Sequence, residues 1–442
     1  MQEFFMPKTI AVVGVSRAPE KVGHVIFRNL YQHFTVYPVH LHEETILGRK
    51  AYTSVLNIPE PIDLAIITVP AQSVVRVVEE CGKKRIHHII IVSSGFKEIG
   101  NTRGEYELAK VLDKYKIQSI GPNCLGVFDA HSGFDTLFLP QRKLTRPKPG
   151  VISFISQSGA VGSAVLDLLA AEQFGFAKFI SYGNGTNVTE TDLLEYLGKD
   201  PQTKVICLYI EGIKDGRHFM EVAQKIKKPI IAIKGGRTEH GAKATLSHTG
   251  SLAGSYEIYK GAWKQSRIVI ADSLQEVFDI ARLFEKLPKP EGKRVQVITN
   301  GGGYGILAID ALEGSGLPLA ALSARSKEKL KWHMPKIVSV NNPLDLVGDA
   351  TDERYDLALE TCMNDKNVDA ILLIILHQTP LLTEKVVDIV KKYFGKKPIV
   401  VVSTGGKQTK MLSEKLEHAG FPVFDFPETA VHALNKFLEY FN

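Results

Sequence analysis

Short runs of β-branched and aliphatic residues alternate with longer amphipathic stretches along almost the whole chain. Five of these runs lie in the first 130 residues: Thr9–Val13, Val36–Val39, Leu64–Val69, His88–Val92 and Gln118–Ile120. Each run is followed by a turn residue or by a helical period. Strands that alternate with helices in this way build parallel sheets with helices on their faces. The pattern therefore predicts an α/β fold.

Two further sets of predicted strands follow. The second set is Val151–Ser156, Phe179–Ser181, Val205–Ile210, Ile230–Ile233 and Ile268–Ile270. The third set is Val295–Ile298, Leu319–Leu322, Ala370–Ile375, Ile399–Val402 and Val423–Phe426. Proline-rich segments at Leu139–Gly150 and Lys286–Gly292 separate the sets, and we predict that both are linkers because proline interrupts helices and central strands. At roughly 150 residues per domain, the chain length also suggests three domains, which we place at residues 1–140, 150–287 and 293–442.

The composition is that of an ordinary globular protein. Hydrophobic residues make up 44% of the chain and charged residues 23%, so neither disorder nor a collagen-like structure is expected. The formal net charge is +6 at pH 7, and the basic surplus is spread along the chain rather than gathered into one stretch. We therefore expect no nucleic-acid binding, whereas small anionic ligands suit this charge.

The cysteines and the hydropathy pattern indicate a cytoplasmic protein. Four cysteines, Cys81, Cys124, Cys207 and Cys362, lie far apart and show no zinc-type spacing with histidine, so we predict reduced thiols and no metal site. The first residues lack the basic start and apolar run of a signal peptide. No apolar stretch reaches the ~20 residues of a membrane span, so no membrane association is expected.

A glycine turn follows the first predicted strand. Gly14 stands at the strand end, and Ser16, Arg17 and Lys21 follow it before the next helix. Free N–H groups and the helix dipole at such a turn can hold a phosphate. The spacing differs from G-x-G-x-x-G, and the second strand lacks the acidic residue that binds a ribose, so a ligand richer in phosphate than NAD is favoured. Alternatively, the turn serves only chain reversal and helix packing, with solvated basic side chains.

Small and polar residues mark other strand ends in the same way. In the first domain these are Val69, Pro70, Ser94, Pro122 and Asn123. In the second domain they are Ser156, Gln157, Ser158 and Gly159, directly before a strongly helical run. Open α/β sheets bind ligands at this edge, and hydroxyls at a helix start can hold an oxyanion. The alternatives are ordinary βα turns and, for the serines, simple helix capping.

The segment Lys234–Gly254 is rich in glycine, hydroxyl-bearing and small residues, and we predict a mobile loop. It contains His248, whose neighbours are Ser247, Thr249, Gly250 and Ser251. An imidazole in such an open setting can attack phosphorus, although a single histidine is more often a surface or hydrogen-bonded residue. A nucleophilic imidazole needs an acceptor for its second nitrogen. Glu211, directly after a predicted strand, is the best-placed candidate.

Several motifs occur in the order of a known family over nearly the whole chain. They are Gly14-Val-Ser-Arg17, Lys21-Val-Gly23, Ser94-Gly-Phe-Lys-Glu98, Gly121-Pro-Asn-Cys-Leu-Gly126, Ser156-Gln-Ser-Gly-Ala160, Asp192-Leu-Leu-Glu-Tyr-Leu197, Ser247-His-Thr-Gly-Ser-Leu-Ala-Gly254 and Asn342-Pro-Leu-Asp345. With these motifs the chain resembles the nucleoside-diphosphate-forming acyl-CoA synthetase superfamily, which includes the succinyl-CoA synthetases. The resemblance is strongest to the α subunits of archaeal ADP-forming acetyl-CoA synthetases.

The resemblance implies a Rossmann-like CoA-binding domain followed by two flavodoxin-like parallel-sheet domains. It also implies that acyl-CoA, phosphate and ADP are interconverted with the acid, CoA and ATP through an acyl phosphate and a phosphohistidine. His248 matches the phosphorylated residue, and Glu211 matches the glutamate that orients and stabilises it. The CoA-binding residues would be Gly14, Ser16, Arg17, Lys21, Val69, Pro70, Ser94, Pro122 and Asn123. The phosphate-binding residues would be Ser156, Gln157, Ser158, Gly159, Thr249, Gly250 and Ser251.

A partner subunit is also implied. The superfamily needs an ATP-grasp domain for ADP and Mg²⁺, and none is recognisable in this sequence. The resemblance therefore implies a separate ATP-grasp β subunit that holds the nucleotide and Mg²⁺, an α2β2 heterotetramer, and a His248 segment that swings toward the β subunit.

Two segments depart from the family pattern. Val39-His-Leu-His-Glu43 stands where relatives often have Asn-Pro-Lys, and Gly183–Glu190 lacks a lysine and an aspartate. One alternative is a catalytically silent CoA-binding regulatory protein of the same fold. An NAD-dependent dehydrogenase is a second alternative, which the missing dinucleotide fingerprint disfavours. The glycine-rich segment Thr299–Gly305 resembles an anion-binding helix start or, equally, a tight βα connection.

Overall fold

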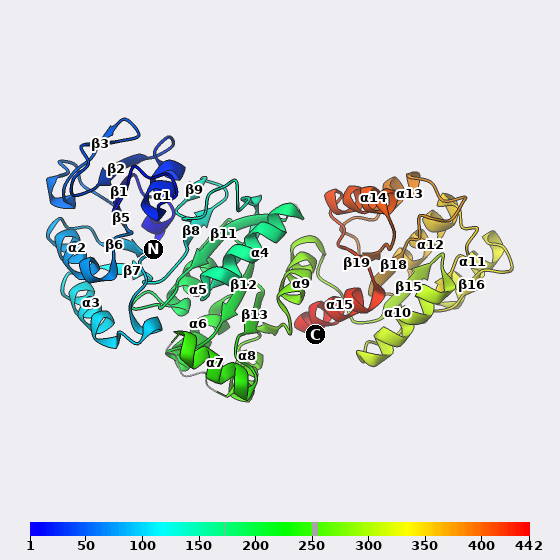
Figure 1. Cartoon of the computed structure of the whole chain (residues 1–442). Helices are drawn as coiled ribbons and strands as arrows, with labels where there is room; N and C mark the ends of the chain where they lie inside the picture. Colours follow the sequence, from blue (N-terminus) through cyan, green and yellow to red (C-terminus); the bar gives the residue numbers. More distant parts are fainter. Residues whose placement is uncertain (173, 250–254) are drawn as a thin grey trace. The chain divides into compact units, whose positions relative to one another are not determined.

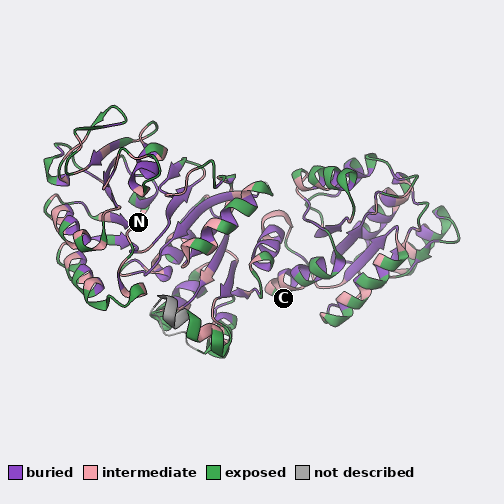
Figure 2. Cartoon of the chain, viewed as in Figure 1, coloured by how far each residue is buried: buried purple, intermediate pink, exposed green. Residues whose placement is uncertain are grey.

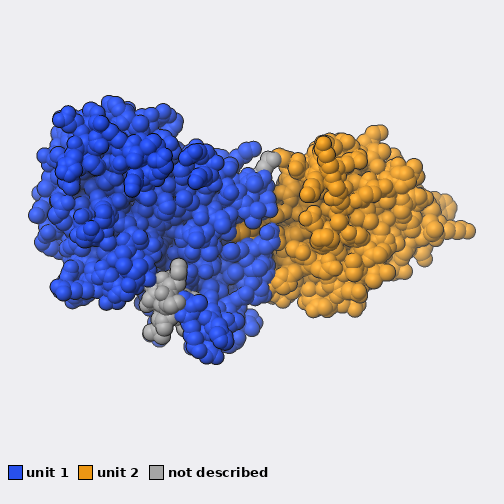
Figure 3. Space-filling view, viewed as in Figure 1, with its two compact units in different colours: residues 1–277 blue, residues 278–442 orange. Residues whose placement is uncertain are grey.

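The computed structural model describes residues 1–172, 174–249 and 255–442, and only the backbone for residues 245–249. Within this range the chain forms two compact units, residues 1–277 and residues 278–442 (Figure 3). The first unit holds two large β-sheets and a small hairpin of β3 (Thr45–Ile46) and β4 (Arg49–Lys50). The second unit holds a third large sheet.

The first sheet is fully parallel, with the strand order β2-β1-β5-β6-β7. Its strands are β1 (Thr9–Val13), β2 (Thr35–Val39), β5 (Leu64–Ile67), β6 (His88–Ile91) and β7 (Gln118–Ile120). Its helices are α1 (Val22–Leu30), α2 (Ala71–Lys83) and α3 (Thr102–Lys114), with short 3-10 turns η1 (Gln2–Phe4), η2 (Val55–Asn57) and η3 (Lys97–Ile99). All five strands predicted for this region are confirmed.

Alternate residues of β1 point to opposite faces of the first sheet. Ala11 and Val13 belong to the core beneath α2 and α3, which pack against each other (Figure 1). Ile10 and Val12 belong to a second core, which also contains Ile155 of the neighbouring sheet. Because both faces are covered, the strands are apolar on both sides, as parallel strands usually are.

The second sheet has the order β14-β13-β12-β10-β11-β8-β9. Five parallel strands confirm the second predicted set: β10 (Lys148–Ser156), β11 (Gly175–Ser181), β12 (Val205–Ile210), β13 (Ile230–Lys234) and β14 (Val269–Ile270). Two antiparallel strands, β8 (Gly126–Asp129) and β9 (Phe134–Asp135), complete the sheet on the side of β11. Residues 126–135 thus add to the second sheet, although they follow directly on the strands of the first.

The predicted linker Leu139–Gly150 is too long, because its last residues, including Pro149, belong to a strand. The linker ends early because β10 begins at Lys148 and runs between β11 and β12. Pairing of β10 with β12 begins only at Ile152, and the register with β11 shifts between Pro149 and Ile152. A proline at the bulged start of a strand costs no hydrogen bond in the central ladder, so this position tolerates it.

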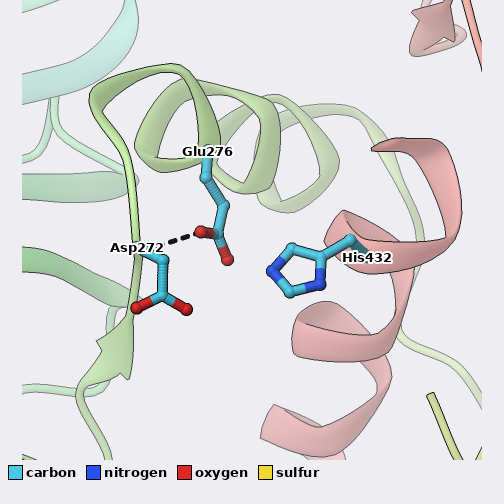
Figure 4. Close-up of side chains that lie close together, drawn as sticks. All are labelled: Asp272, Glu276 and His432. Carbon is cyan, nitrogen blue, oxygen red and sulfur yellow. Dashed lines mark hydrogen bonds between the residues drawn. The ribbon is translucent and has the colours of Figure 1, made fainter. Parts of the chain in front are cut away.

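Five helices accompany the second sheet in the described residues. They are α4 (Gly159–Ala171), α5 (Glu190–Lys199), α6 (Gly216–Lys225), α7 (Glu239–Thr249) and α8 (Tyr256–Gln265). The next helix, α9 (Leu274–Lys286), begins in the first unit and continues into the second. Two hydrogen bonds fix the start of α9. Ser273 Oγ accepts the N–H of Glu276 at 3.1 Å, and Glu276 Oε2 accepts the N–H of Asp272 at 2.6 Å (Figure 4). These contacts satisfy N–H groups that a helix start otherwise leaves without partners.

The sheet of the second unit has the order β16-β17-β15-β18-β19-β20 and is parallel except between β16 and β17. Its strands are β15 (Val295–Thr299), β16 (Ser339–Val340), β17 (Leu344–Asp345), β18 (Ala370–Ile374), β19 (Ile399–Val402) and β20 (Val423–Phe424). Its helices are α10 (Gly302–Gly314), α11 (Ala324–His333), α12 (Asp352–Asn364), α13 (Lys385–Lys391), α14 (Lys407–His418) and α15 (Pro427–Phe441).

The predicted strand Leu319–Leu322 is wrong. Leu319 makes only an isolated bridge, to Val295 of β15. Farther along β15, the residues Ile298 and Thr299 pair with β17 instead. The chain also turns soon after Leu322, because Ser323 caps α11 by accepting the N–H of Ser326. The apolar run is therefore too short to extend into a strand.

Buried residues follow the strands, and exposed residues follow the outer sides of the helices (Figure 2). All four cysteines are buried and free, which confirms the predicted thiols. Among the helices that the structure describes, none has both the length and the apolar character needed to cross a membrane.

Candidate functional site

A cavity of about 890 Å³ opens in the first unit at the carboxyl ends of β5, β6 and β7. Its opposite wall is the turn between β10 and α4. The polar lining residues are Thr68, Ser93, Ser94, Lys97, Glu98, Asn123, Gln157, Ser158, Ser163, Asn184 and Glu211. The volume lies in the range of about 300–1,000 Å³ that small-molecule sites occupy. Its place at the strand ends is the one at which open α/β sheets bind ligands.

The cavity brings together predicted site residues from both sheets. From the strand ends of the first sheet come Val69, Pro70, Ser94 and Asn123, and from the second come Gln157, Ser158, Gly159 and Glu211. Other candidates with described side chains do not line this cavity: Gly14, Ser16, Arg17, Lys21, Pro122 and Ser156. Residues that are far apart in sequence therefore share one cavity, and the segment of the first glycine turn reaches its lining only at Val22.

Close packing dictates the residue types of the first glycine turn. Gly14 has φ = 95°, a left-handed conformation that favours glycine. A Cβ on Gly23 would lie 2.5 Å from the Gly14 carbonyl oxygen and 2.7 Å from Thr68 Oγ1. Ser16 Oγ accepts the N–H of Ala18 at 3.1 Å. The packing alternative from the sequence therefore accounts for the glycines, and it does not conflict with a ligand at the turn.

This packing predicts opposite outcomes for two glycine substitutions. Gly23→Ala is expected to lower the free energy of unfolding by about 1–3 kcal/mol, because the new methyl group meets backbone that cannot move away. Gly261→Ala is the matched control, since Gly261 lies inside α8 with nothing within 4 Å of a Cβ. It should stabilise the chain by about 0.5–1 kcal/mol. Thermal unfolding of both variants checks the prediction, and an unchanged transition for Gly23→Ala would contradict it.

Arg17 of the glycine turn is paired with an acidic residue. Its Nε lies 2.6 Å from Glu43 Oε2 and donates to the carbonyl oxygen of Thr45. Glu43 belongs to the segment that departs from the family pattern, so the departure places a carboxylate on this arginine. The Arg17 side chain is 62% exposed and that of Glu43 is 26% exposed, so solvent screens the pair at the arginine end.

The serine-glycine turn caps α4 and also holds Glu211. Ser158 Oγ accepts the N–H of Val161 at 3.3 Å, as the capping alternative predicts. Ser156 is buried, and its Oγ donates to the carbonyl oxygen of Ser158 at 2.7 Å. Gln157 Oε1 accepts the N–H of Glu211 at 2.7 Å and that of Gly212 at 3.1 Å. The start of α4 thus faces the cavity, and Gln157 connects it to the end of β12.

The predicted loop at Lys234–Gly254 is wrong for most of its length. Lys234 ends β13, and α7 covers Glu239–Thr249. Thr238 Oγ1 accepts the N–H of Gly241, and Lys243 pairs with Glu239 one turn earlier at 2.8 Å. This cap and this i,i+4 pair support the helix in spite of its glycine.

The predicted nucleophile lies at the end of α7. The backbone of His248 and Thr249 forms the last residues of this helix. Their side chains, together with Gly250 and Ser251, lie outside the described residues.

Glu211 lies directly after β12 and is 7% exposed. Burial and the neighbouring Glu211 carboxylate, to which the hydroxyl hydrogen-bonds, raise the pKa of Tyr209 to about 12. Lys234 Nζ donates to the Glu211 carbonyl oxygen at 2.7 Å. The Glu211 backbone is therefore held by β13 and the α4 turn, and Tyr209 on β12 contacts its carboxylate.

Six polar lining residues were not among the site residues predicted from the sequence: Thr68, Ser93, Lys97, Glu98, Ser163 and Asn184. Three of these, Lys97, Glu98 and Asn184, contact one another. Asn184 Nδ2 donates to Glu98 Oε2 at 2.8 Å, and Lys97 Nζ donates to the Asn184 carbonyl oxygen at 2.8 Å. Burial alone would raise the pKa of Glu98, but hydrogen bonds from the Gly95 N–H and the Asn184 amide hold it below its usual value. The signal was present in the motif Ser94–Glu98, whose last residues we did not single out.

Three family models match the chain in succession. A CoA binding domain matches residues 8–130, a succinyl-CoA ligase like flavodoxin domain matches residues 149–284, and a ligase-CoA domain matches residues 295–438. Together with the parallel sheets, these matches confirm the predicted fold class. Fold and cavity define a protein of the CoA-ligase class.

Relatives of known identity specify the family. The α subunit of ADP-forming acetate–CoA ligase II from Pyrococcus furiosus is 41% identical, with 97% of this chain and 95% of that protein covered. An acetyl-coenzyme A synthetase from Candidatus Korarchaeum cryptofilum, solved with phosphate and ADP, has a TM-score of 0.92 at 36% identity, with 99% of this chain and 96% of that chain covered. The chain belongs to the family of ADP-forming acetate–CoA ligases, as an α subunit.

Some relatives are longer. The ADP-forming acetate–CoA ligase I of Archaeoglobus fulgidus is 40% identical over 98% of this chain, but the match covers only 63% of that protein. In such relatives one polypeptide therefore carries a large part that has no counterpart in this chain.

Proposed function

We propose that this chain is the catalytic α subunit of an ADP-forming acetyl-CoA synthetase. It interconverts acyl-CoA, phosphate and ADP with the free acid, CoA and ATP. The observation that carries the proposal is the cavity that joins the strand ends of the first sheet to the α4 turn and Glu211. Such a cavity can hold the thioester of acyl-CoA against a phosphate at a helix start.

CoA is bound along the strand ends of the first sheet. Val69, Pro70, Ser94 and Asn123 contribute the wall of the cavity. Gly14, Ser16, Arg17, Lys21 and Pro122 hold the part of CoA that extends beyond it. Arg17 exchanges Glu43 for a phosphate of CoA in this arrangement.

The first chemical step forms an acyl phosphate. An oxygen of inorganic phosphate attacks the thioester carbonyl, the C–S bond breaks, and CoA leaves as the thiolate, which takes up a proton. The phosphate is proposed to bind at the start of α4, because the N–H groups there and the helix dipole stabilise negative charge. The phosphate-binding residues are Ser156, Gln157, Ser158 and Gly159.

The second step moves the phosphoryl group to His248. A ring nitrogen attacks phosphorus, the bond from phosphorus to the acyl oxygen breaks, and the acid leaves as its carboxylate. Positive charge develops on the ring as the N–P bond forms. The Glu211 carboxylate accepts the N–H of the other ring nitrogen and stabilises this charge. Thr249, Gly250 and Ser251 complete the phosphate contacts.

ATP is formed on a second subunit. We propose an ATP-grasp β subunit that holds ADP and Mg²⁺, in an α2β2 heterotetramer in the cytoplasm. The part of the longer relatives that has no counterpart here supports a separate subunit. Phosphohistidine is suited to this arrangement, since it can carry the phosphoryl group between two sites when the end of α7 moves.

The test is reconstitution of the complete reaction. The chain is co-expressed with its candidate ATP-grasp partner, and ATP formation is measured with acetyl-CoA, phosphate and ADP. We expect ATP that depends on both subunits and on all three substrates. CoA binding without ATP formation in the assembled complex would instead support a silent regulatory protein of the same fold.

A further inference from the structure

The peptide that carries Glu211 is held from three separate elements. Its N–H is accepted by Gln157 Oε1 of the α4 turn at 2.7 Å. Its carbonyl oxygen accepts a hydrogen bond from Lys234 Nζ at the end of β13 at 2.7 Å. Two residues later, the N–H of Ile213 donates to the hydroxyl of Tyr259 on α8 at 2.9 Å. The end of β12 is thus fixed in place by side chains and not by a regular turn.

Lys234 is an unusual member of this arrangement. The residue is 2% exposed, yet its ammonium donates only to two backbone carbonyls in the contacts described, those of Glu211 and Gly235. It also lies 4.9 Å from the centre of the Tyr259 ring. Burying a charged group in this way is costly unless the group is paired, so the position requires a compensating interaction.

The Glu211 side chain lies close to this lysine. A Cβ on Gly235 would lie 3.3 Å from Glu211 Cγ and 2.7 Å from the Tyr209 hydroxyl, so the chain directly after Lys234 passes beside the Glu211 side chain. Burial lowers the pKa of the Lys234 ammonium, and attraction to Glu211 opposes that shift. The attraction is mutual, so the same ammonium favours the ionised form of Glu211.

We propose that Lys234 is a positioning residue for the phosphoryl transfer: its ammonium fixes the Glu211 peptide and supplies positive charge that keeps the Glu211 carboxylate ionised for its proposed role toward His248. This inference rests on the proposed function. It assigns a role to the last residue of β13, which precedes the turn leading into α7. Lys234 therefore connects the end of β12, where Glu211 lies, with the segment that leads into α7 and His248.

The experiment measures phosphohistidine formation on the full chain from acetyl-CoA and labelled phosphate as a function of pH. For Lys234→Met we expect the rate near neutral pH to fall about ten- to hundredfold, the effect of losing a hydrogen bond to a charged group. The acid limb of the profile should move to higher pH, because an ionised Glu211 forms less readily without the cation. Lys234→Gln, which keeps a donor but no charge, should show the same shift, whereas Lys234→Arg should keep the wild-type limb.

The acid limb of the pH profile is assigned to Glu211 only after the other ionisable groups near it are considered. Tyr209 on β12 and Tyr259 on α8 do not titrate there, because burial raises the pKa of both phenols. Glu190, at the start of α5, is a nearby carboxyl whose pKa burial raises. Glu190→Gln is therefore measured alongside and should leave the limb in place.

Lys228 gives a matched control at the opposite end of β13. This half-buried lysine also donates to two backbone carbonyls, those of Leu197 and Asp200, at 2.7 and 2.6 Å. Lys228→Met should therefore lower stability without moving the pH profile. An unshifted profile in folded Lys234→Met or Lys234→Gln would overturn the inference. Wild-type protein that takes up no label would instead refute the proposed function.

Discussion

His248→Ala is expected to abolish ATP formation from acetyl-CoA, phosphate and ADP. The substitution removes the nucleophile that carries the phosphoryl group between the subunits, and loss of a nucleophile typically lowers turnover by about 10⁴-fold or more. CoA binding should persist, because the residues proposed to bind CoA lie at the strand ends of the first sheet and in the first glycine turn, not on α7. Turnover of the reconstituted complex and calorimetric titration with CoA check both halves of this prediction.

His240→Ala is the matched control for His248→Ala. His240 is an exposed residue near the start of the same helix, α7, and has no role in the proposed mechanism. Its replacement should leave turnover within about twofold of wild type, since surface substitutions generally perturb little. If instead both variants lost activity equally, the helix and not one imidazole would be responsible. Retained activity in His248→Ala would refute the phosphohistidine.

Most strands of the three sheets could be predicted because each of these is an apolar run bounded by turn residues. The strands β8, β9, β16 and β17 were not predicted, and three of them are only two residues long. The predictions were wrong where the surrounding structure, and not the local sequence, determines the conformation. Pro149 lies within a central strand since the bulge at its start removes the cost of the missing N–H. Leu319 has strand-like neighbours, but the chain turns into α11 before they can pair.

The site could be predicted less completely than the fold. Strand ends such as Ser94 and Asn123 were found because the carboxyl edge of a parallel sheet is defined by the strands themselves. Asn184 and Lys97 were missed since their importance comes from a hydrogen bond between residues 87 positions apart. Lys234 directly follows the predicted strand Ile230–Ile233, and only the fold reveals that its ammonium is buried against the Glu211 carbonyl oxygen.

Glu211→Gln is expected to slow phosphohistidine formation by about 10²–10³-fold. The amide keeps the shape of the side chain but removes the negative charge that balances the developing imidazolium, and losses of this size follow the removal of one electrostatic partner in a preorganised site. The backbone contacts to Gln157 and Lys234 involve main-chain atoms and are retained. Single-turnover labelling by acyl phosphate isolates the step, since it bypasses CoA release.

Glu190→Gln separates this charge effect from a general change of the buried polar region. Glu190 is 3% exposed and is a second carboxyl near the strand ends of the second sheet. Burial, together with the charge of Glu190, raises the pKa of Tyr182 and Tyr259. Glu190 does not line the cavity. Labelling of this variant should therefore stay within a few-fold of wild type. Equal slowing of both variants would mean that the substitutions act by disturbing the fold, and not by removing a charge from the site. A Glu211→Gln chain that is labelled at the wild-type rate would remove Glu211 from the mechanism, and the imidazolium would then need another anion from the segment around His248.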